Sequence, residues 1–174
     1  MFGKVRNASM VLLSAIFLAG CSSSGTFTMK QEMIEPINNQ KTVSIWVKSD
    51  KVPESEKEDA NKACSSLQEK LYARLISQGL FKSSVIYPNK GDYSLEVDVL
   101  GVRLVSNAAR IWWGVMAGAS GIEANVLLRD ETGKVLTEYH ADGSSATHPF
   151  SSESGPDNAV DQLATQIAQA IKKR

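Results

Sequence analysis

The stretch Leu18–Cys21 constrains this chain most, because it separates an N-terminal export signal from the part that must fold. Basic Lys4 and Arg6 precede an apolar run over Met10–Leu18, and two small residues follow it. This order is that of a secretory signal. Only 14 uncharged residues separate Arg6 from Cys21, whereas a membrane-spanning helix needs about 20 apolar residues. The pattern therefore predicts a signal peptide over residues 1–20 and a mature chain of 154 residues.

The position of Cys21, directly after two small residues, resembles the lipobox of bacterial lipoproteins. The resemblance implies that the Cys21 thiol takes a diacylglyceryl group, that the chain is cut before it, and that the new amino group is acylated. Such a three-chain anchor holds a protein stably to a bilayer. In Gram-negative lipoproteins, a serine such as Ser22 after the cysteine implies transfer to the outer membrane. The alternative is an ordinary signal peptide with an incidental cysteine.

Composition indicates one ordinary domain behind this anchor. Without residues 1–20 the chain has 17 basic residues against 19 acidic ones, a net charge of −2. That balance supplies no polybasic surface, so we expect no nucleic-acid partner. The only other cysteine, Cys64, has no partner for a bridge within the mature chain. Its spacing predicts a small apolar side chain on the buried face of a helix, and a reactive thiol is the alternative.

Polar residues dominate the start of the mature chain, and alternating or helical patterns begin only later. Residues 21–41 are predicted to be a flexible tether, part of which could pack along the domain as an irregular strap. Residues 42–174 are predicted to be a single domain. Its strongest helix signal starts with a capping box between Ser55 and Glu58 and ends at Gly79. A second helix is expected to start at Pro156.

Period-two patterns predict the strands. They cover residues 42–48, 85–87, 93–104, 122–130 and 134–141, with a phase change at Gly101 that suggests a bulge and a hairpin turn that uses Gly133. The last three strands should form an antiparallel meander. We therefore predict an α/β fold of order β-α-β-β-β-β-α. In it, a mixed, mostly antiparallel sheet of about five strands carries two helices on one face, as a two-layer sandwich.

The middle of the chain resembles the bacterial lipoproteins grouped as domain of unknown function 4410. The resemblance covers roughly Val97–Gly143, and the residues that carry it are Arg110, Gly114, Gly118, Ala119, Ala124, Val126, Asp130 and Thr132–Leu136. It implies an envelope lipoprotein. It also implies an α/β fold akin to the N-terminal domain of the Tol-system propeller protein and to curli-secretion lipoproteins. It implies no catalytic residues.

The segment Ile111–Ile122 is unusually apolar and contains two adjacent tryptophans, Trp112 and Trp113. It is too short for a membrane helix. One interpretation is a sheet connection whose indoles pack into the core. The other is an exposed contact surface, in which Arg110, Trp112 and Trp113 bind a partner, because aromatic and arginine side chains dominate binding hot spots.

The sequence offers few groups for catalysis. His140, Asp142 and His148 could form a metal cluster in a loop over residues 140–148, but no fixed ligand spacing supports it. No serine has the G-x-S-x-G context of a hydrolase. We therefore expect no enzyme activity, no cofactor and no metal. The expected function is that of a lipid-anchored envelope lipoprotein, a non-enzymatic accessory or binding module for an envelope protein. The alternative is a small periplasmic enzyme or carrier that uses the 140–148 loop.

Overall fold

The computed structural model describes residues 26–105, 119–145 and 155–172 and has the predicted α/β class. Within these ranges six strands form a single sheet, one strand more than predicted, and two long helices pack against it. The elements are β1 (Phe27–Gln31), β2 (Thr42–Lys48), the short 3-10 helix η2 (Glu54–Glu56), α2 (Lys57–Ser77), β3 (Ser83–Ile86), β4 (Tyr93–Arg103), β5 (Gly121–Arg129), β6 (Val135–Ser144) and α4 (Pro156–Lys172).

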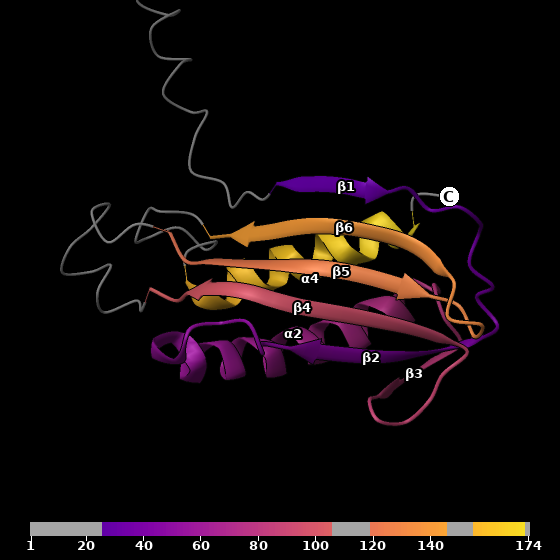
Figure 1. Ribbon diagram of the computed structural model, residues 1–174, viewed down its shortest axis with the longest axis horizontal. Coiled ribbons are helices and arrows are strands. Elements are labelled where there is room, and N and C mark those ends of the chain that lie inside the picture. Colours follow the sequence, from indigo (N-terminus) through magenta and orange to yellow (C-terminus); the bar gives the residue numbers. More distant parts are fainter. Residues whose placement is uncertain (1–25, 106–118, 146–154, 173–174) are drawn as a thin grey trace, which may run out of the picture.

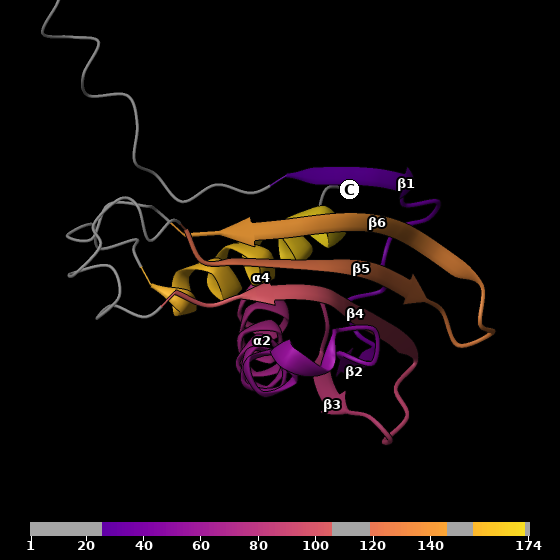
Figure 2. The same cartoon turned by 60° about the vertical axis from the view of Figure 1, so that its left-hand side comes forward.

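The strand order across the sheet is β1-β6-β5-β4-β2-β3. Strand β2 runs parallel to both β3 and β4, while the meander β4-β5-β6 and the edge strand β1 are antiparallel to their neighbours. Both helices cover the same face, α2 over β2 and β4 and α4 over β5 and β6 (Figures 1 and 2). The two-layer arrangement predicted from the sequence is confirmed, as is the meander.

Helix α2 has the predicted buried stripe but not the predicted start. Ala60, Ala63, Leu67, Leu71 and Leu75 are buried, at the three- and four-residue spacing of one helix face. The capping box is wrong, because Ser55 lies inside η2 and no side chain caps α2 at Glu56.

The end of α2 agrees with the prediction. Gly79 adopts a positive φ of 66°, and its amide donates to the Ile76 carbonyl while the Leu80 amide donates to the Leu75 carbonyl. Two such bonds around a left-handed glycine form a Schellman motif, which satisfies carbonyls that the helix itself leaves unpaired.

Strand β1 lies within the segment for which the sequence predicts a tether. Phe27, Thr28 and Met29 pair antiparallel with Ala141, His140 and Tyr139 of β6. Downstream, Met33 is buried in the core, and the Ile34 amide donates to the Leu136 carbonyl at 3.1 Å. Residues 27–34 therefore add an edge strand and its continuation to the domain.

The later strands confirm two local predictions. In β4, Val99 pairs with Ala124 and Gly101 with Glu123, so Leu100 is the extra residue of a bulge at the predicted phase change. Gly133 has a φ of 86° in the β5–β6 turn, as predicted. Strand β6 runs on to Ser144 rather than ending near Ala141. His140 and Asp142 are therefore strand residues and not loop residues.

Cys64 lies at the rim of the core and is only partly buried, so the prediction that it is buried holds in part. Its side chain packs against the buried cluster between the sheet and α2. Desolvation by burial raises the pKa of the Cys64 thiol, and this outweighs the opposing hydrogen bond with Ser49. A higher pKa leaves less of the thiolate that reacts with electrophiles at neutral pH.

We predict that Cys64→Ala costs on the order of 1 kcal/mol of unfolding free energy, because it removes one partly buried sulfur from the rim of the core. Urea unfolding of the two proteins measures this cost. A thiol reagent should label Cys64 more slowly than a cysteine placed at the exposed neighbouring position by Ser65→Cys in the Cys64→Ala background. Equal labelling rates for the two cysteines would contradict the prediction.

Candidate functional site

At one end of the sheet, strands β4, β5 and β6 adjoin the two segments of the sequence that contain predicted site residues. Strand β4 leads to Val105, β5 begins after Ser120, and β6 leads to Ser145. Residues 106–118 and 146–154 join the domain at these three points. The predicted contact residues Arg110, Trp112 and Trp113 belong to the first segment and His148 to the second. All four, like Cys21, lie outside the described residues.

Buried serines tie these three chain ends together. Ser120 Oγ accepts a hydrogen bond from the Val105 amide at 2.9 Å, and the Ser120 amide donates to Ser145 Oγ at 3.1 Å. The Ser145 amide in turn donates to the Ser120 carbonyl at 2.9 Å. Ser120 and Ser145 are only 0% and 3% exposed. Val105, Ser120 and Ser145 are therefore held at fixed positions relative to one another. Sequence reasoning missed this arrangement because serine carries no apolar periodicity.

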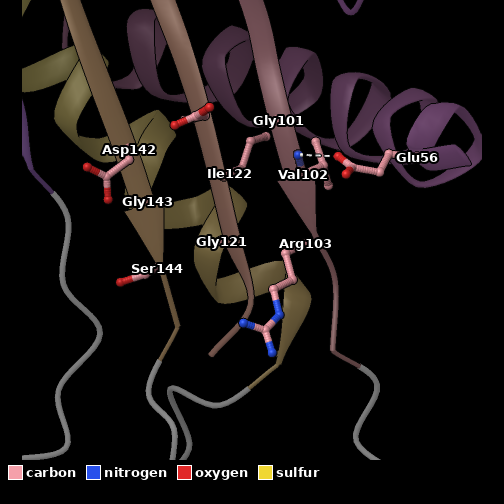
Figure 3. A pocket seen from close by; sticks show the side chains of 10 residues that line it. Glu56, Gly101, Val102, Arg103, Gly121, Ile122, Asp142, Gly143 and Ser144 are labelled. Carbon is pink, nitrogen blue, oxygen red and sulfur yellow. Dashed lines mark hydrogen bonds between the residues drawn. The ribbon is translucent and has the colours of Figure 1, made fainter. Parts of the chain in front are cut away.

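A cavity of about 370 Å³ lies beside this end of the sheet. Its lining comes from η2 and from β4, β5 and β6, and consists of Glu56, Gly101, Val102, Arg103, Gly121, Ile122, Glu123, Asp142, Gly143 and Ser144. In Figure 3, Asp142 and Ser144 lie on one side and Arg103 and Glu56 on the other. The cavity is broad and open rather than a deep cleft.

Three carboxylates and one guanidinium give the cavity its charge. A Glu56 carboxylate oxygen accepts a hydrogen bond from the Val102 amide at 3.4 Å (Figure 3). Asp142 Oδ1 accepts from both the Thr26 amide at 3.0 Å and the Thr26 hydroxyl. Glu123 is exposed and lies over the bulge at Gly101. Such a lining suits contact with cationic or hydrogen-bond-donating groups of a partner.

Gly143 is required by packing rather than by a ligand. A Cβ at this position would lie 2.2 Å from the Ala159 carbonyl oxygen and 2.7 Å from the Leu163 amide nitrogen. Both atoms belong to the backbone of α4, which therefore presses directly on β6 at this cavity. By contrast, a Cβ at Gly121 would meet only the Gly143 carbonyl oxygen, at 3.9 Å.

The histidine cluster considered from the sequence is only partly described. His140 lies in β6, where its Nδ1 is 3.2 Å from Asn125 Oδ1 on the neighbouring strand. Asp142 points its carboxylate at Thr26, and His148 lies outside the described residues. Within residues 26–105, 119–145 and 155–172, no group of three or more His, Cys, Asp or Glu residues is placed to hold a metal ion. No helix in these ranges is long and apolar enough to cross a membrane.

Comparison with known proteins gives one family and one set of solved structures. The family model described as "Domain of unknown function (DUF4410)" matches residues 25–149. No curated protein matches the chain. Two structures of the PelC dodecamer from Paraburkholderia phytofirmans superpose with TM-scores of 0.57 and 0.55, at 16% and 18% identity. They cover 87% and 85% of this chain and 99% and 97% of PelC, so the two proteins share a fold.

Proposed function

We propose, from the premise that this chain belongs to the DUF4410 family, that it is a lipid-anchored lipoprotein of the cell envelope and acts by binding another envelope protein. It carries out no reaction of its own in this proposal. The observation that carries it is the serine-tied end of the sheet, which holds both ends of a segment rich in hot-spot residues. Binding residues are commonly placed on loops that a rigid scaffold positions.

The anchoring part of the proposal rests on the chain before the domain. Cys21 follows an apolar run and two small residues. The next residue is Ser22, and not the aspartate that would retain a lipoprotein at the inner membrane. An acylated Cys21 would place the domain at the outer membrane, facing the periplasm. Only the residues between Cys21 and Phe27 would separate the lipid from strand β1. The domain would therefore stay within a few nanometres of the bilayer surface.

The binding part rests on the composition at the same end of the sheet. Arg110, Trp112 and Trp113 combine a planar cation with two large aromatic surfaces, and such residues carry most of the energy in protein interfaces. The cavity at the end of the sheet where β4 and β5 adjoin this segment in the sequence adds the carboxylates of Glu56, Glu123 and Asp142. A partner that presents an apolar patch with cationic groups at its rim would complement both features. The partner in this proposal includes a second copy of the chain, because PelC, which shares the fold, assembles as a dodecamer.

We predict that Trp112→Ala and Trp113→Ala each abolish recovery of the partner, because each removes a large aromatic anchor. The melting temperature of the protein should fall by only a few degrees. Pull-down of the tagged full chain from cross-linked cells, followed by mass spectrometry, measures the first effect, and thermal unfolding of the purified variants measures the second. His140→Ala provides a matched control, since it truncates a polar ring of β6 and should leave partner recovery unchanged.

Two outcomes would overturn this proposal. If either tryptophan substitution costs the roughly 3–5 kcal/mol that is typical of a buried Trp→Ala change, the indoles belong to the core and the contact surface is elsewhere. If the wild-type chain recovers no protein but retains a small molecule or a metal that His140→Ala releases, the chain is a carrier or an enzyme instead.

A further inference from the structure

Strand β1 is the edge strand of the sheet. Among the residues that the structure describes, its only neighbouring strand is β6 (Figure 1). The Asp142 amide donates to the Thr26 carbonyl at 3.1 Å, and Thr28 is the partner of His140. In an antiparallel ladder the residues that bond to one neighbour alternate with those that face the other side. The backbone groups of Phe27 and Met29 therefore point away from the sheet, ready to pair with another strand.

The side chains of these two residues are also incompletely covered. Phe27 and Met29 are each 39% exposed. Few other large apolar side chains in the described residues are as exposed as these two. They lie on the helix side of the sheet, where the Phe27 ring is 4.6 Å from the buried Tyr139 ring. A groove of about 180 Å³ separates them from α4, lined by Phe27, Met29, Gln166, Gln169 and Ala170.

One of the side chains that line the groove carries an unsatisfied polar atom. Gln166 Oε1 is buried and has no hydrogen-bond partner within the described part of the chain. A buried acceptor without a partner is rare in folded proteins, because it has lost water and gained nothing in return. Free backbone groups, two exposed apolar side chains and an unpartnered acceptor thus occur at one edge of the domain.

We propose that a second copy of this chain occupies this edge, with the two β1 strands paired antiparallel about a two-fold axis at Thr28. In that register Phe27 of each copy faces Met29 of the other, and these are the residues whose backbone groups point outward. A phenyl ring beside a thioether is a favourable contact. The two sheets become one continuous sheet, and the four apolar side chains close the groove between the two copies of α4.

The sequence of β1 is suited to self-pairing. Between Thr26 and Met29 it has no charged residue, and Lys30 is bound to Glu138 of its own chain at 3.2 Å. The register shift between Met29 and Gln31 limits the free ladder to three residues, so the strand cannot slide into a longer pairing. The alternation of side chains between the two sheet faces reads the same in both directions over Phe27, Thr28 and Met29. A two-fold interface requires such a symmetric pattern.

The two-fold axis makes a single cysteine a sufficient test. Thr28 would face Thr28 of the other copy as a non-hydrogen-bonded pair, with Cα atoms about 4.5 Å apart, within the range that a disulfide can bridge. The experiment uses the full chain with Cys21→Ser and Cys64→Ala, which leave no other thiol. With Thr28→Cys added, mild oxidation should convert most of the protein into a disulfide-linked dimer on a non-reducing gel.

Lys30→Cys in the same background is the matched control. It lies on the same strand, but its two copies would be roughly 13 Å apart, four residues of strand, beyond the reach of a disulfide. It should stay monomeric on the gel. Adding Met29→Lys to Thr28→Cys should reduce cross-linking at least tenfold, since it buries a charge opposite Phe27. Circular dichroism checks that each variant is folded.

Three results would overturn the proposal. The first is a Thr28→Cys protein that stays uncross-linked while folded. The second is equal cross-linking by Lys30→Cys, which would indicate random collision. The third is light scattering of the uncross-linked chain that finds an assembly larger than a dimer. That result would favour head-to-tail contact between β1 and β3, the strand at the opposite edge of the sheet.

Discussion

Replacing Gly143 with alanine is expected to destabilise the domain strongly. The new Cβ would lie 2.2 Å from the Ala159 carbonyl oxygen and 2.7 Å from the Leu163 amide nitrogen, distances that no pair of such atoms tolerates. Neither atom can rotate away, because both belong to the backbone of α4. The helix would have to move off β6, and Leu163, Ala164 and Ile167 would lose their burial.

We expect this substitution to cost more than about 3 kcal/mol, at the upper end for overpacked cores. Natural domains have only about 5–15 kcal/mol of stability in total. Gly121→Ala is the matched control, because it lies at the same cavity and meets one atom at 3.9 Å, an ordinary contact. Urea unfolding of the two variants measures the difference. Equal midpoints for both would show that α4 does not press on β6 as described.

The parts of the fold that were predictable are those in which one face of an element is buried. Strands β4, β5 and β6 alternate between the helix-covered face and the open face, so their residues alternate in the sequence. The bulge at Leu100 was predictable because it shifts that alternation by one residue. Gly79 and Gly133 were predictable because turns of their kind need a positive φ.

Strand β1 was not predictable in the same way. Four of its five residues are exposed, because the strand lies at the edge of the sheet and α4 does not cover it. Without a buried face it leaves no alternation that stands out from a polar tether. Its pairing with β6 joins residues more than 100 positions apart, which local sequence patterns do not report. The capping box failed for a related reason, since the 3-10 turn at Glu54–Glu56 displaced the helix start past Ser55.

The site at Arg110, Trp112 and Trp113 stays a prediction from the sequence, and the scaffold beside it was not predictable. An apolar, tryptophan-rich segment between two strands had to meet the sheet at the ends of β4 and β5. The roles of Ser120 and Ser145 depend on the approach of β6 to that point, and neither residue belongs to a sequence motif. The acidic lining from Glu56, Glu123 and Asp142 combines three separate elements. A sequence can suggest a segment as a candidate for contact, but a cavity lined by separate elements requires the fold.

Replacing Cys21 with serine is expected to abolish lipid attachment and to leave the chain as an unprocessed precursor. Lipid attachment requires the thiol, because serine cannot form the thioether that carries the diacylglyceryl group. Cells grown with labelled palmitate should therefore show a labelled wild-type protein and a Cys21→Ser protein at background, which accumulates as the longer precursor. The wild-type protein should stay in the membrane fraction through a high-salt wash, since several acyl chains together hold a protein far more firmly than one.

Cys64→Ser is the control for this experiment, because it removes the only other cysteine of the chain and leaves the lipidation sequence intact. It should take up palmitate and fractionate as the wild type does. The two substitutions thus separate loss of a thiol in general from loss of the anchor. Palmitate on Cys21→Ser, or a wild-type protein that salt alone releases, would contradict lipid anchoring. The β1 interface would stand unaffected, because Thr28→Cys cross-linking is measured in the Cys21→Ser background.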